Sequence, residues 1–356
     1  MKIFVTCVIA AKRNLAPFLA FACFFSFVLA GCPDTAWAGN FEVGSVALND
    51  TFSTASFVTV NYTNTYATVP VVFVIATSDG SNPCSIRIRN RTTTGCEMCQ
   101  VEPDPADGPH VAMTVHYLAI ETGTTILPNG DKIYVTTHDT QTVQCGSGVG
   151  CSPGWDTVSF PGVGSTPAVI AQIQTMANET GTPPSTTSTP WLTVAIDNVT
   201  TSSVDVALER SEVATGSITS DETIGIAVME GGLSGTFVDS GGTTVLYESI
   251  VAPGAVKGWN NGCFNVSFTQ AYTTTPLVMA SMNSRNGNNG GWLRRCDLTT
   301  SYVGLTVDED QYNDSERNHI AEDAGILVFS LEFDASGVPD NPDVAVTEVA
   351  WMGTFA

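Results

Sequence analysis

Three landmarks recur in the same order three times along this chain of 356 residues, and this repetition constrains the fold more than any other feature. Each copy has a proline that leads into an apolar stretch, then an Asn or Asp followed by hydroxyl-bearing residues, and then a closing apolar stretch. The copies are Pro70, Asn90 and 116–120; Pro167, Asn198 and 225–229; and Pro276, Asp297 and 325–329. A period near one hundred residues predicts three whole structural units, because solenoid repeats are only about 20 to 50 residues long.

The pattern within each copy is typical of β-strands. Apolar and other residues alternate at 41–46, 199–208 and 305–307, and Asp79-Gly80 and Asn289-Gly290 provide turn signals. Thr, Ser, Gly and Val are abundant, and they favour strands and turns over helices. We therefore expect an all-β chain of three tandem antiparallel β-sandwiches, each of about 100 residues.

Gly-rich segments near residues 131 and 241 mark the expected boundaries between the three sandwiches. The first sandwich covers residues 39–131, the second 132–241 and the third 242–356, with a further edge strand at 343–351. Because the copies are alike, we also expect them to pack around a pseudo-threefold axis.

Residues 1–38 have the pattern of a signal peptide. Three basic residues precede an apolar run over 15–31, and the Ala-Trp-Ala sequence at 36–38 offers a cleavage site. Two alternatives stay open. The sequence at 29–32, Leu-Ala-Gly-Cys, resembles a bacterial lipobox that would leave a lipid on Cys32, and the apolar run is just long enough to serve as a retained membrane anchor. We expect a secreted or cell-surface protein.

Acidic residues outnumber basic ones by 35 to 13, which gives a net charge of −22 at pH 7. Removal of residues 1–38 takes away three basic residues and Asp34, so the mature chain has 10 basic and 34 acidic residues and a net charge of −24. Such a charge repels phosphate backbones and anionic lipid headgroups. Nucleic acid is therefore not expected as a partner, whereas cations and neutral ligands such as glycans or cell-surface polysaccharides remain.

Seven cysteines follow the leader, and in an oxidising compartment most of them should pair. Cys145 and Cys151 are predicted to close a Gly-rich loop. Cys263 and Cys296 are predicted to form a bridge inside the third unit. The remaining three allow one more bridge and leave an odd thiol, with Cys84 paired to Cys99 or to Cys96.

Framework residues of the first unit form a recognisable set. They are Gly44-Ser45-Val46, Tyr62, Tyr66, Pro70-Val71-Val72, Thr92-Thr93-Thr94-Gly95 and the closing stretch 116–120. In this set the chain resembles the H-type lectin domain, the small antiparallel sandwich of discoidins and snail agglutinins. The resemblance implies binding of galactose-type sugars, typically N-acetylgalactosamine, through loops brought together in trimers. The aromatic residues that contact the sugar in that family have no match in 102–110, so the family's sugar specificity is not carried over.

No enzyme motif is found in the sequence, and the four histidines lie far apart, so we expect a binding protein rather than an enzyme. Aromatic side chains stack on the apolar faces of sugar rings. Trp191 and Trp292 begin predicted strands after flexible loops and are the main ligand-binding candidates. Further candidates are Arg294 next to Trp292, and three residues of the 102–110 loop: Asp104, Asp107 and His110.

The densest polar cluster, 308–316, follows a predicted strand. Its oxygen-bearing side chains could hold a hard cation such as calcium, with Asp308, Asp310, Asn313 and Asp314 as ligands. The cluster lacks the glycine-pivoted spacing of an EF-hand, and a solvated loop is the alternative. We expect no other cofactor.

Two classes of function fit these features. The first is a carbohydrate-binding protein or adhesin. The second is a structural subunit of an extracellular filament, pilus or sheath that has no sugar ligand and associates with itself.

Overall fold

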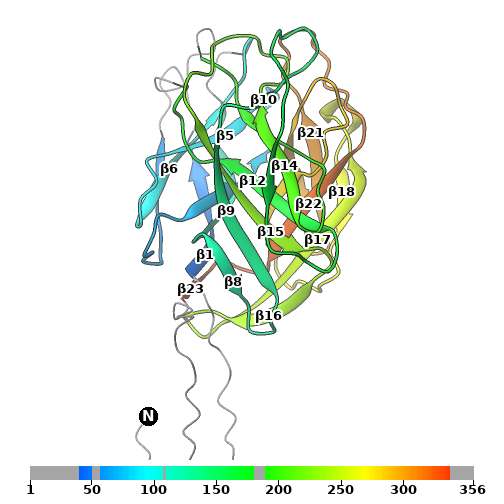
Figure 1. Ribbon diagram of the computed structural model, residues 1–356. Helices are drawn as coiled ribbons and strands as arrows, with labels where there is room; N and C mark the ends of the chain where they lie inside the picture. Colours follow the sequence, from blue (N-terminus) through cyan, green and yellow to red (C-terminus); the bar gives the residue numbers. More distant parts are fainter. Residues whose placement is uncertain (1–39, 50–56, 107–109, 180–188, 337–356) are drawn as a thin grey trace, which may run out of the picture. The chain divides into compact units, whose positions relative to one another are not determined.

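The computed structural model describes residues 40–49, 57–106, 110–179 and 189–336 (Figure 1). The predicted leader with Cys32, the candidate ligand Asp107 and the predicted strand at 343–351 lie outside the described residues. None of the described residues belongs to a helix with the length and apolar character needed to cross a membrane.

The described residues form strands and turns, with one 3-10 turn, η1 (Trp259–Asn261), and no α-helix. We call the three copies of the sequence pattern repeats 1, 2 and 3, in chain order. In repeat 1 the strands are β1 (Asn40–Leu48), β2 (Val58–Asn61), β3 (Val71–Val74), β4 (Ala76–Thr77), β5 (Ser85–Arg89), β6 (Gly95–Val101) and β7 (Met113–Ile120), followed by β8 (Gly123–Ile126). In repeat 2 they are β9 (Lys132–Thr140), β10 (Val143–Gln144), β11 (Asp156–Ser159), β12 (Pro167–Ile173), β13 (Thr193–Asp197), β14 (Ser203–Glu209) and β15 (Glu222–Glu230), followed by β16 (Ser234–Val238). In repeat 3 they are β17 (Thr244–Val256), β18 (Phe264–Ser267), β19 (Leu277–Met282), β20 (Trp292–Leu298), β21 (Tyr302–Asp308) and β22 (Glu322–Phe329), followed by β23 (Phe333–Ser336). The predicted all-β, largely antiparallel class is confirmed.

The strands form six sheets, which we group as one inner and one outer sheet for each repeat. The inner sheets have the orders β23-β1-β7-β3, β8-β9-β15-β12 and β16-β17-β22-β19. The outer sheets are β2-β6-β5, β11-β14-β10 with β13 also on β14, and β18-β21-β20-β4. The inner closing strands β15 and β22 are buried along almost their whole length, because each packs against apolar side chains on both faces.

The strand that follows each repeat joins the inner sheet of a different repeat. β8 pairs with β9 of repeat 2, β16 pairs with β17 of repeat 3, and β23 returns to pair with β1 of repeat 1. The sequence prediction placed residues 123–126 and 234–238 inside the preceding sandwiches, before the boundaries at 131 and 241. Their hydrogen bonds instead belong to the following sheets, so the three repeats are connected in a closed cycle.

A shared apolar core joins the three inner sheets. It contains side chains from every repeat, including Phe41 and Phe73 of repeat 1, Ile133 of repeat 2, and Phe329 and Phe333 of repeat 3. The central strands β3, β12 and β19 contact one another. Three further cores lie between the inner and outer sheets of the individual repeats.

Polar side chains link the central strands in the same cyclic direction. Gln174 accepts a hydrogen bond from the Val72 amide at 2.9 Å and donates to the Val72 carbonyl at 2.7 Å. Asn283 does the same to Val169 at 3.0 and 2.7 Å. At the third boundary His116 accepts from the Val278 amide at 3.0 Å. These contacts agree with the cyclic packing expected from the repeats.

Glycine permits the close approach at two of these boundaries. A Cβ atom on Gly225 would lie 2.2 Å from Cγ1 of Val71, and one on Gly325 would lie 2.8 Å from the amide nitrogen of Val169. His116 occupies the corresponding position in repeat 1, and its ring reaches repeat 3 directly. The third boundary is therefore built with different residues.

The predicted bridges Cys145–Cys151 and Cys263–Cys296 are both present. The predicted third bridge is wrong: Cys84, Cys96 and Cys99 are free and buried. The register explains this, because Ser85 lies opposite Val101 and Arg87 lies opposite Cys99, which separates Cys84 from Cys99 by roughly 10 Å along the strand. Cys96 lies still further along β6, opposite Val60. Burial raises the pKa of these thiols to about 12, 11 and 12, so they are neutral.

Candidate functional site

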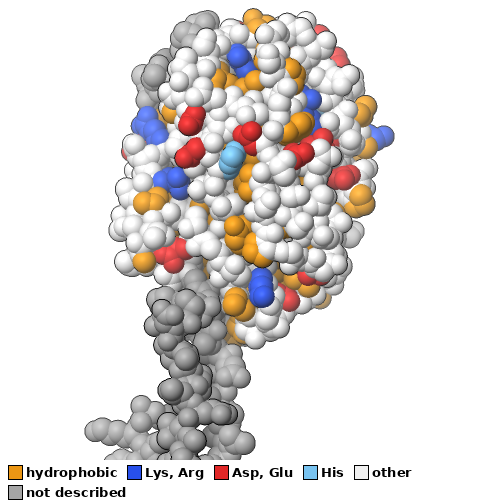
Figure 2. Space-filling view, viewed as in Figure 1, with side chains coloured by type: hydrophobic (Ala, Val, Ile, Leu, Met, Phe, Trp, Pro, Cys, Tyr) orange, Lys and Arg blue, Asp and Glu red, His pale blue; other side chains and the backbone are white. Residues whose placement is uncertain are grey.

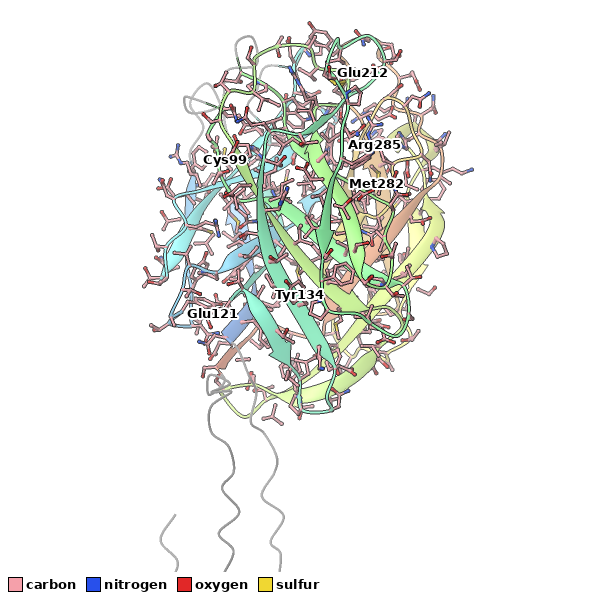
Figure 3. All side chains as sticks on the ribbon, in the orientation of Figure 1. Cys99, Glu121, Tyr134, Glu212, Met282 and Arg285 are labelled. Atoms are coloured by element: carbon pink, nitrogen blue, oxygen red, sulfur yellow. A yellow bond between two sulfur atoms is a disulfide. The ribbon has the colours of Figure 1, made fainter. Side chains whose placement is uncertain are left out.

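The two tryptophans predicted to stack on sugars are buried. Trp191 and Trp292 are 4% and 6% exposed, and their ring centroids are 5.0 Å apart. They form a small apolar cluster with Cys99 and Val101 of repeat 1 and Val213 of repeat 2 (Cys99 is labelled in Figure 3). The Trp292 indole nitrogen donates to the Cys84 carbonyl at 2.7 Å. Because the rings pack against each other and against three repeats, they are contact residues of this junction rather than sugar platforms.

Arg294 and Asp308 were predicted as a sugar ligand and a calcium ligand, and the structure pairs them with each other instead. Both are fully buried, and Nη1 of Arg294 lies 2.7 Å from Oδ2 of Asp308. The other carboxylate oxygen accepts from Arg317 at 2.8 Å. Arg294 also donates to the Thr77 and Asp79 carbonyls of repeat 1. Both oxygens of Asp308 therefore bind guanidinium groups, and its charge is balanced by arginines.

The other predicted calcium ligands differ in their surroundings and in their partners. Asp310 is buried and accepts from the amides of Glu212 and Tyr312, at 2.8 and 2.9 Å. Burial raises the pKa of Asp310 to about 7. Asn313 and Asp314 are exposed, and Asp314 accepts from the Glu316 amide. The described residues contain no group of three or more His, Cys, Asp or Glu side chains arranged to hold a metal ion.

Of the predicted loop candidates, the structure describes Asp104 and His110. Asp104 is half-buried and lines a hollow of about 20 Å³ with Trp191 and Glu179. His110 is buried, and its Nδ1 lies 3.2 Å from the Val111 carbonyl. Burial, with the nearby Arg294 charge, lowers the pKa of His110. Of these two described candidates, His110 is thus buried and Asp104 borders a hollow too small for a sugar ring.

Buried ion pairs recur at the other two boundaries between repeats. Nε of Arg87 in repeat 1 donates to Glu179 of repeat 2 at 2.6 Å. Nε of Arg285 in repeat 3 donates to Glu209 of repeat 2 at 2.5 Å (Arg285 is labelled in Figure 3). Ion pairs with little exposure to solvent therefore lie at each boundary between repeats.

A buried histidine lies between two carboxylates near the start of β22. Nδ1 of His319 contacts Glu309, and its Nε2 lies 2.8 Å from Glu322. Burial lowers the pKa of His319, but the two carboxylates outweigh burial and raise it to about 9. The imidazole is therefore a cation at neutral pH.

Raising the pH should lower the stability of the fold, because His319 loses its proton. A histidine whose pKa rises on folding from 6.5 to about 9 contributes stability that is complete below pH 6.5 and is lost as the pH passes 9. We expect urea unfolding to show a loss of about 2 kcal/mol from pH 6.5 to 8.5 that His319→Gln removes. His138→Gln, at a half-buried histidine on β9, is the control and should keep the loss. A wild-type stability that is flat over this range would contradict the prediction.

The surface offers few apolar patches among the described residues. Large apolar side chains that are exposed are scattered: Val69, Val111, Val238, Tyr312 and Ile320. On the described part of the face in Figure 2, acidic and basic side chains are interspersed. The hollows between repeats are therefore the better candidates for a site.

An open groove of about 670 Å³ lies between repeats 1 and 3. Repeat 1 contributes Ser45, 77–79, Thr114 and His116, and repeat 3 contributes 274–277, 295–298 and 330–332. The parallel pairing of β4 with β20 and the hydrogen bond from the Ser78 amide to the Arg295 carbonyl hold the two walls together. The groove is thus formed only when the two repeats meet.

The groove presents both donors and acceptors. Asp79 accepts from the Thr77 hydroxyl at 2.5 Å, and Asp297 accepts from the Tyr302 hydroxyl at 2.7 Å, so both carboxylates are fixed in place. Arg295 donates from Nη2 to the Thr114 carbonyl at 3.2 Å, while its buried Nε has no partner in the described structure. Burial and the Arg295 charge lower the pKa of His116 to about 3. Because Nδ1 of this neutral ring is an acceptor, Nε2 carries the proton.

A second hollow, of about 240 Å³, adjoins this groove and is lined by Trp259. The two hollows share Ser78 and Cys296, so we call them together the Trp259 groove. Trp259 is half-buried, and the guanidinium groups of Arg294 and Arg317 lie 4.9 and 4.3 Å from its ring centroid. It is therefore a fixed aromatic residue with part of its surface open to the hollow.

Sequence reasoning did not single out Trp259 as the principal aromatic candidate. The signal was present in Lys257-Gly258-Trp259-Asn260-Asn261-Gly262, where small and polar neighbours lack the apolar side chains needed to cover an indole. Trp191 and Trp292 instead lie beside apolar strands.

No family model and no solved structure matches the chain. The H-type lectin resemblance therefore stays a prediction. Among curated proteins, the chain is similar to Halomucin of Haloquadratum walsbyi, with 25% identity over 258 residues, which cover 72% of this chain. The match spans only 2% of that protein's length. The two disulfides are typical of oxidising compartments and support an extracellular location.

Proposed function

We propose that the protein is an extracellular carbohydrate-binding protein that holds neutral sugars in the Trp259 groove. The observation that carries the proposal is the half-buried indole next to a groove of fixed hydrogen-bonding groups. A sugar ring has an apolar face that packs on an indole and hydroxyl groups at its edge that need donors and acceptors. The groove supplies acceptors at Asp79 and Asp297 and donors at Arg295 and His116.

Replacing Trp259 with alanine should weaken binding of a neutral glycan by at least about tenfold, because the stacking surface is lost. The measurement is a glycan array with the intact mature chain, followed by titration calorimetry on the strongest neutral glycan. Trp155→Ala is the matched control, since Trp155 is also half-buried but lies in repeat 2, outside the groove. If no neutral glycan binds the intact chain, with or without calcium, the proposal fails.

A structural subunit of an extracellular layer or filament is the second candidate. It is favoured by the likeness of this chain to a short segment of a far longer protein. The purified mature chain should then form ordered assemblies by size-exclusion chromatography and electron microscopy, and Trp259→Ala should not change them. A monodisperse monomer would argue against this candidate.

A further inference from the structure

A second open cleft, of about 620 Å³, lies between repeats 1 and 2. Repeat 1 contributes Arg89, Asn90 and Arg91 from the end of β5 and the following turn. Repeat 2 contributes 174–177 and Glu179, which follow β12. We call it the Arg91 cleft. It contains polar side chains such as Gln174 and Thr175 beside the apolar Met176 and Ala177.

Arg91 is a half-buried cation with no carboxylate partner among the described residues. Its Nε donates to the Gln174 carbonyl at 3.1 Å, and its Nη1 donates to the Pro70 carbonyl at 2.8 Å. These bonds fix the guanidinium but do not balance its charge, and they leave Nη2 for another acceptor. The titratable groups that act on it are Tyr62 and Cys96, both of which burial keeps neutral.

The two arginines of β5 are neutralised. Arg87 pairs with Glu179, and Arg89 pairs with Glu97 at 2.7 Å and covers the Phe57 ring. A nearby carboxylate, Glu222, accepts from the Thr175 hydroxyl and from the Asn178 amide. The local acidic groups are thus already engaged, and Arg91 remains the group in the cleft that needs an anion.

The scaffold itself does not require an arginine here. Asn90, Asn198 and Asp297 are the matching landmarks of the three repeats, so Val199 and Leu298 stand where repeat 1 has Arg91. Leu298 lines the groove between repeats 1 and 3, and Arg91 lines the cleft between repeats 1 and 2. The same position of the repeat therefore places an apolar leucine in one hollow and a charged arginine in the corresponding hollow.

We infer that the Arg91 cleft binds the carboxylate of an acidic sugar residue, with Arg91 as the charge-bearing contact and the Gln174 to Ala177 wall against the ring. Arg91 can bind a carboxylate end-on through Nη1 and Nη2, the geometry in which guanidinium recognises this group. The wall offers an amide, a hydroxyl and an apolar surface, which suits a sugar ring with a polar edge and an apolar face. The inference extends the proposed carbohydrate binding to a second site of a different ligand class.

The test titrates the mature chain with trigalacturonic acid and with its methyl ester at low salt, where charge contacts are least screened. The acid should bind and the ester, which lacks the negative charges, should bind at least tenfold more weakly. No binding of the acid, or equal binding of the two to a Trp259→Ala chain in which the neutral-sugar groove is impaired, would overturn the inference. Acetate that displaced the trisaccharide at equal concentration would overturn the assignment of the sugar ring.

Variants then locate the site. Arg91→Leu, which copies the residue at position 298, should weaken binding of the acid at least tenfold, and Arg91→Lys should fall between it and the wild type. Lys132→Leu removes an exposed positive charge on β9 and should leave the affinity unchanged. Trp259→Ala should also leave it unchanged, which separates this site from the Trp259 groove. An equal loss in Lys132→Leu, or none in either Arg91 variant, would overturn the assignment.

Discussion

Replacing Phe333 with alanine should lower the free energy of unfolding by about 3–5 kcal/mol, as expected for loss of a buried phenylalanine from a core. Phe333 is 6% exposed and lies on β23, the last strand that the structure describes. Its ring centroid lies 5.1 Å from that of Phe41, 5.0 Å from Phe237 and 5.4 Å from Phe329. This side chain, on β23 of the repeat 1 inner sheet, thus contacts one ring of its own sheet and two rings of the repeat 3 inner sheet.

Phe333→Ala should also weaken the pairing of β23 with β1, which closes the cycle of repeats. Val43 of β1 pairs with Phe333, and Phe41 pairs with Ala335, so β23 covers an edge of β1 that would otherwise be unpaired. Hydrogen exchange should therefore show faster exchange for the β1 amides that face β23 than for the amides of β6, which belongs to an outer sheet. Denaturant unfolding gives the accompanying change in stability.

Phe268→Ala is the matched control for Phe333→Ala. Phe268 is only partly buried and packs against Tyr272, at 5.3 Å between ring centroids, in the separate core of repeat 3. Phe268→Ala should lower the free energy of unfolding less than Phe333→Ala does, and it should leave the hydrogen exchange of the β1 amides unchanged. If β1 is as protected in the Phe333 variant as in the wild type, β23 does not hold the cycle closed.

The repeated landmarks predicted the strand class because alternation and turn residues are local features. They did not predict where β8, β16 and β23 pair. Ser234–Val238, for example, follows β15 closely and looks like the end of repeat 2, but its register is set by Thr244–Glu248 of the next repeat. Such pairing depends on which apolar faces meet in the shared core, and a single stretch of sequence does not contain that information.

The candidate site shows the same division between local and tertiary information. Trp191 and Trp292 are strand-starting aromatic residues in the sequence, and only the meeting of three repeats buries them. Asp308 lies in an acidic run typical of a solvated or calcium-binding loop, but Arg294 and Arg317 arrive from β20 and from the loop before β22. The disulfides of repeats 2 and 3 were predicted correctly, whereas the bridge predicted within repeat 1 was not, because the register of β5 on β6 that separates Cys84 from Cys99 cannot be seen in the spacing of the cysteines.

Replacing Asp308 with asparagine should lower the free energy of unfolding by about 3–5 kcal/mol, the typical penalty for leaving a buried charge without its partner. The variant keeps the size of the side chain but leaves Arg294, which is fully buried, and Arg317 without a carboxylate. The loss should reach repeat 1 as well, because Arg294 donates to the Thr77 carbonyl and Arg317 donates to the Ser81 carbonyl at 2.8 Å. Denaturant unfolding measures the first effect, and hydrogen exchange in residues 77–82 measures the second.

Glu97→Gln is the control, because it also changes a carboxylate into an amide at an arginine partner. The Arg89–Glu97 pair is 30% and 29% exposed, and water can solvate the remaining guanidinium, so the cost should stay below about 1 kcal/mol. The difference between the two variants isolates the effect of burial from the effect of losing an ion pair. If both variants lose the same stability, the buried Arg294–Asp308–Arg317 cluster does not hold repeat 1 to repeat 3, and the loop at 77–82 must be fixed chiefly by the pairing of β4 with β20.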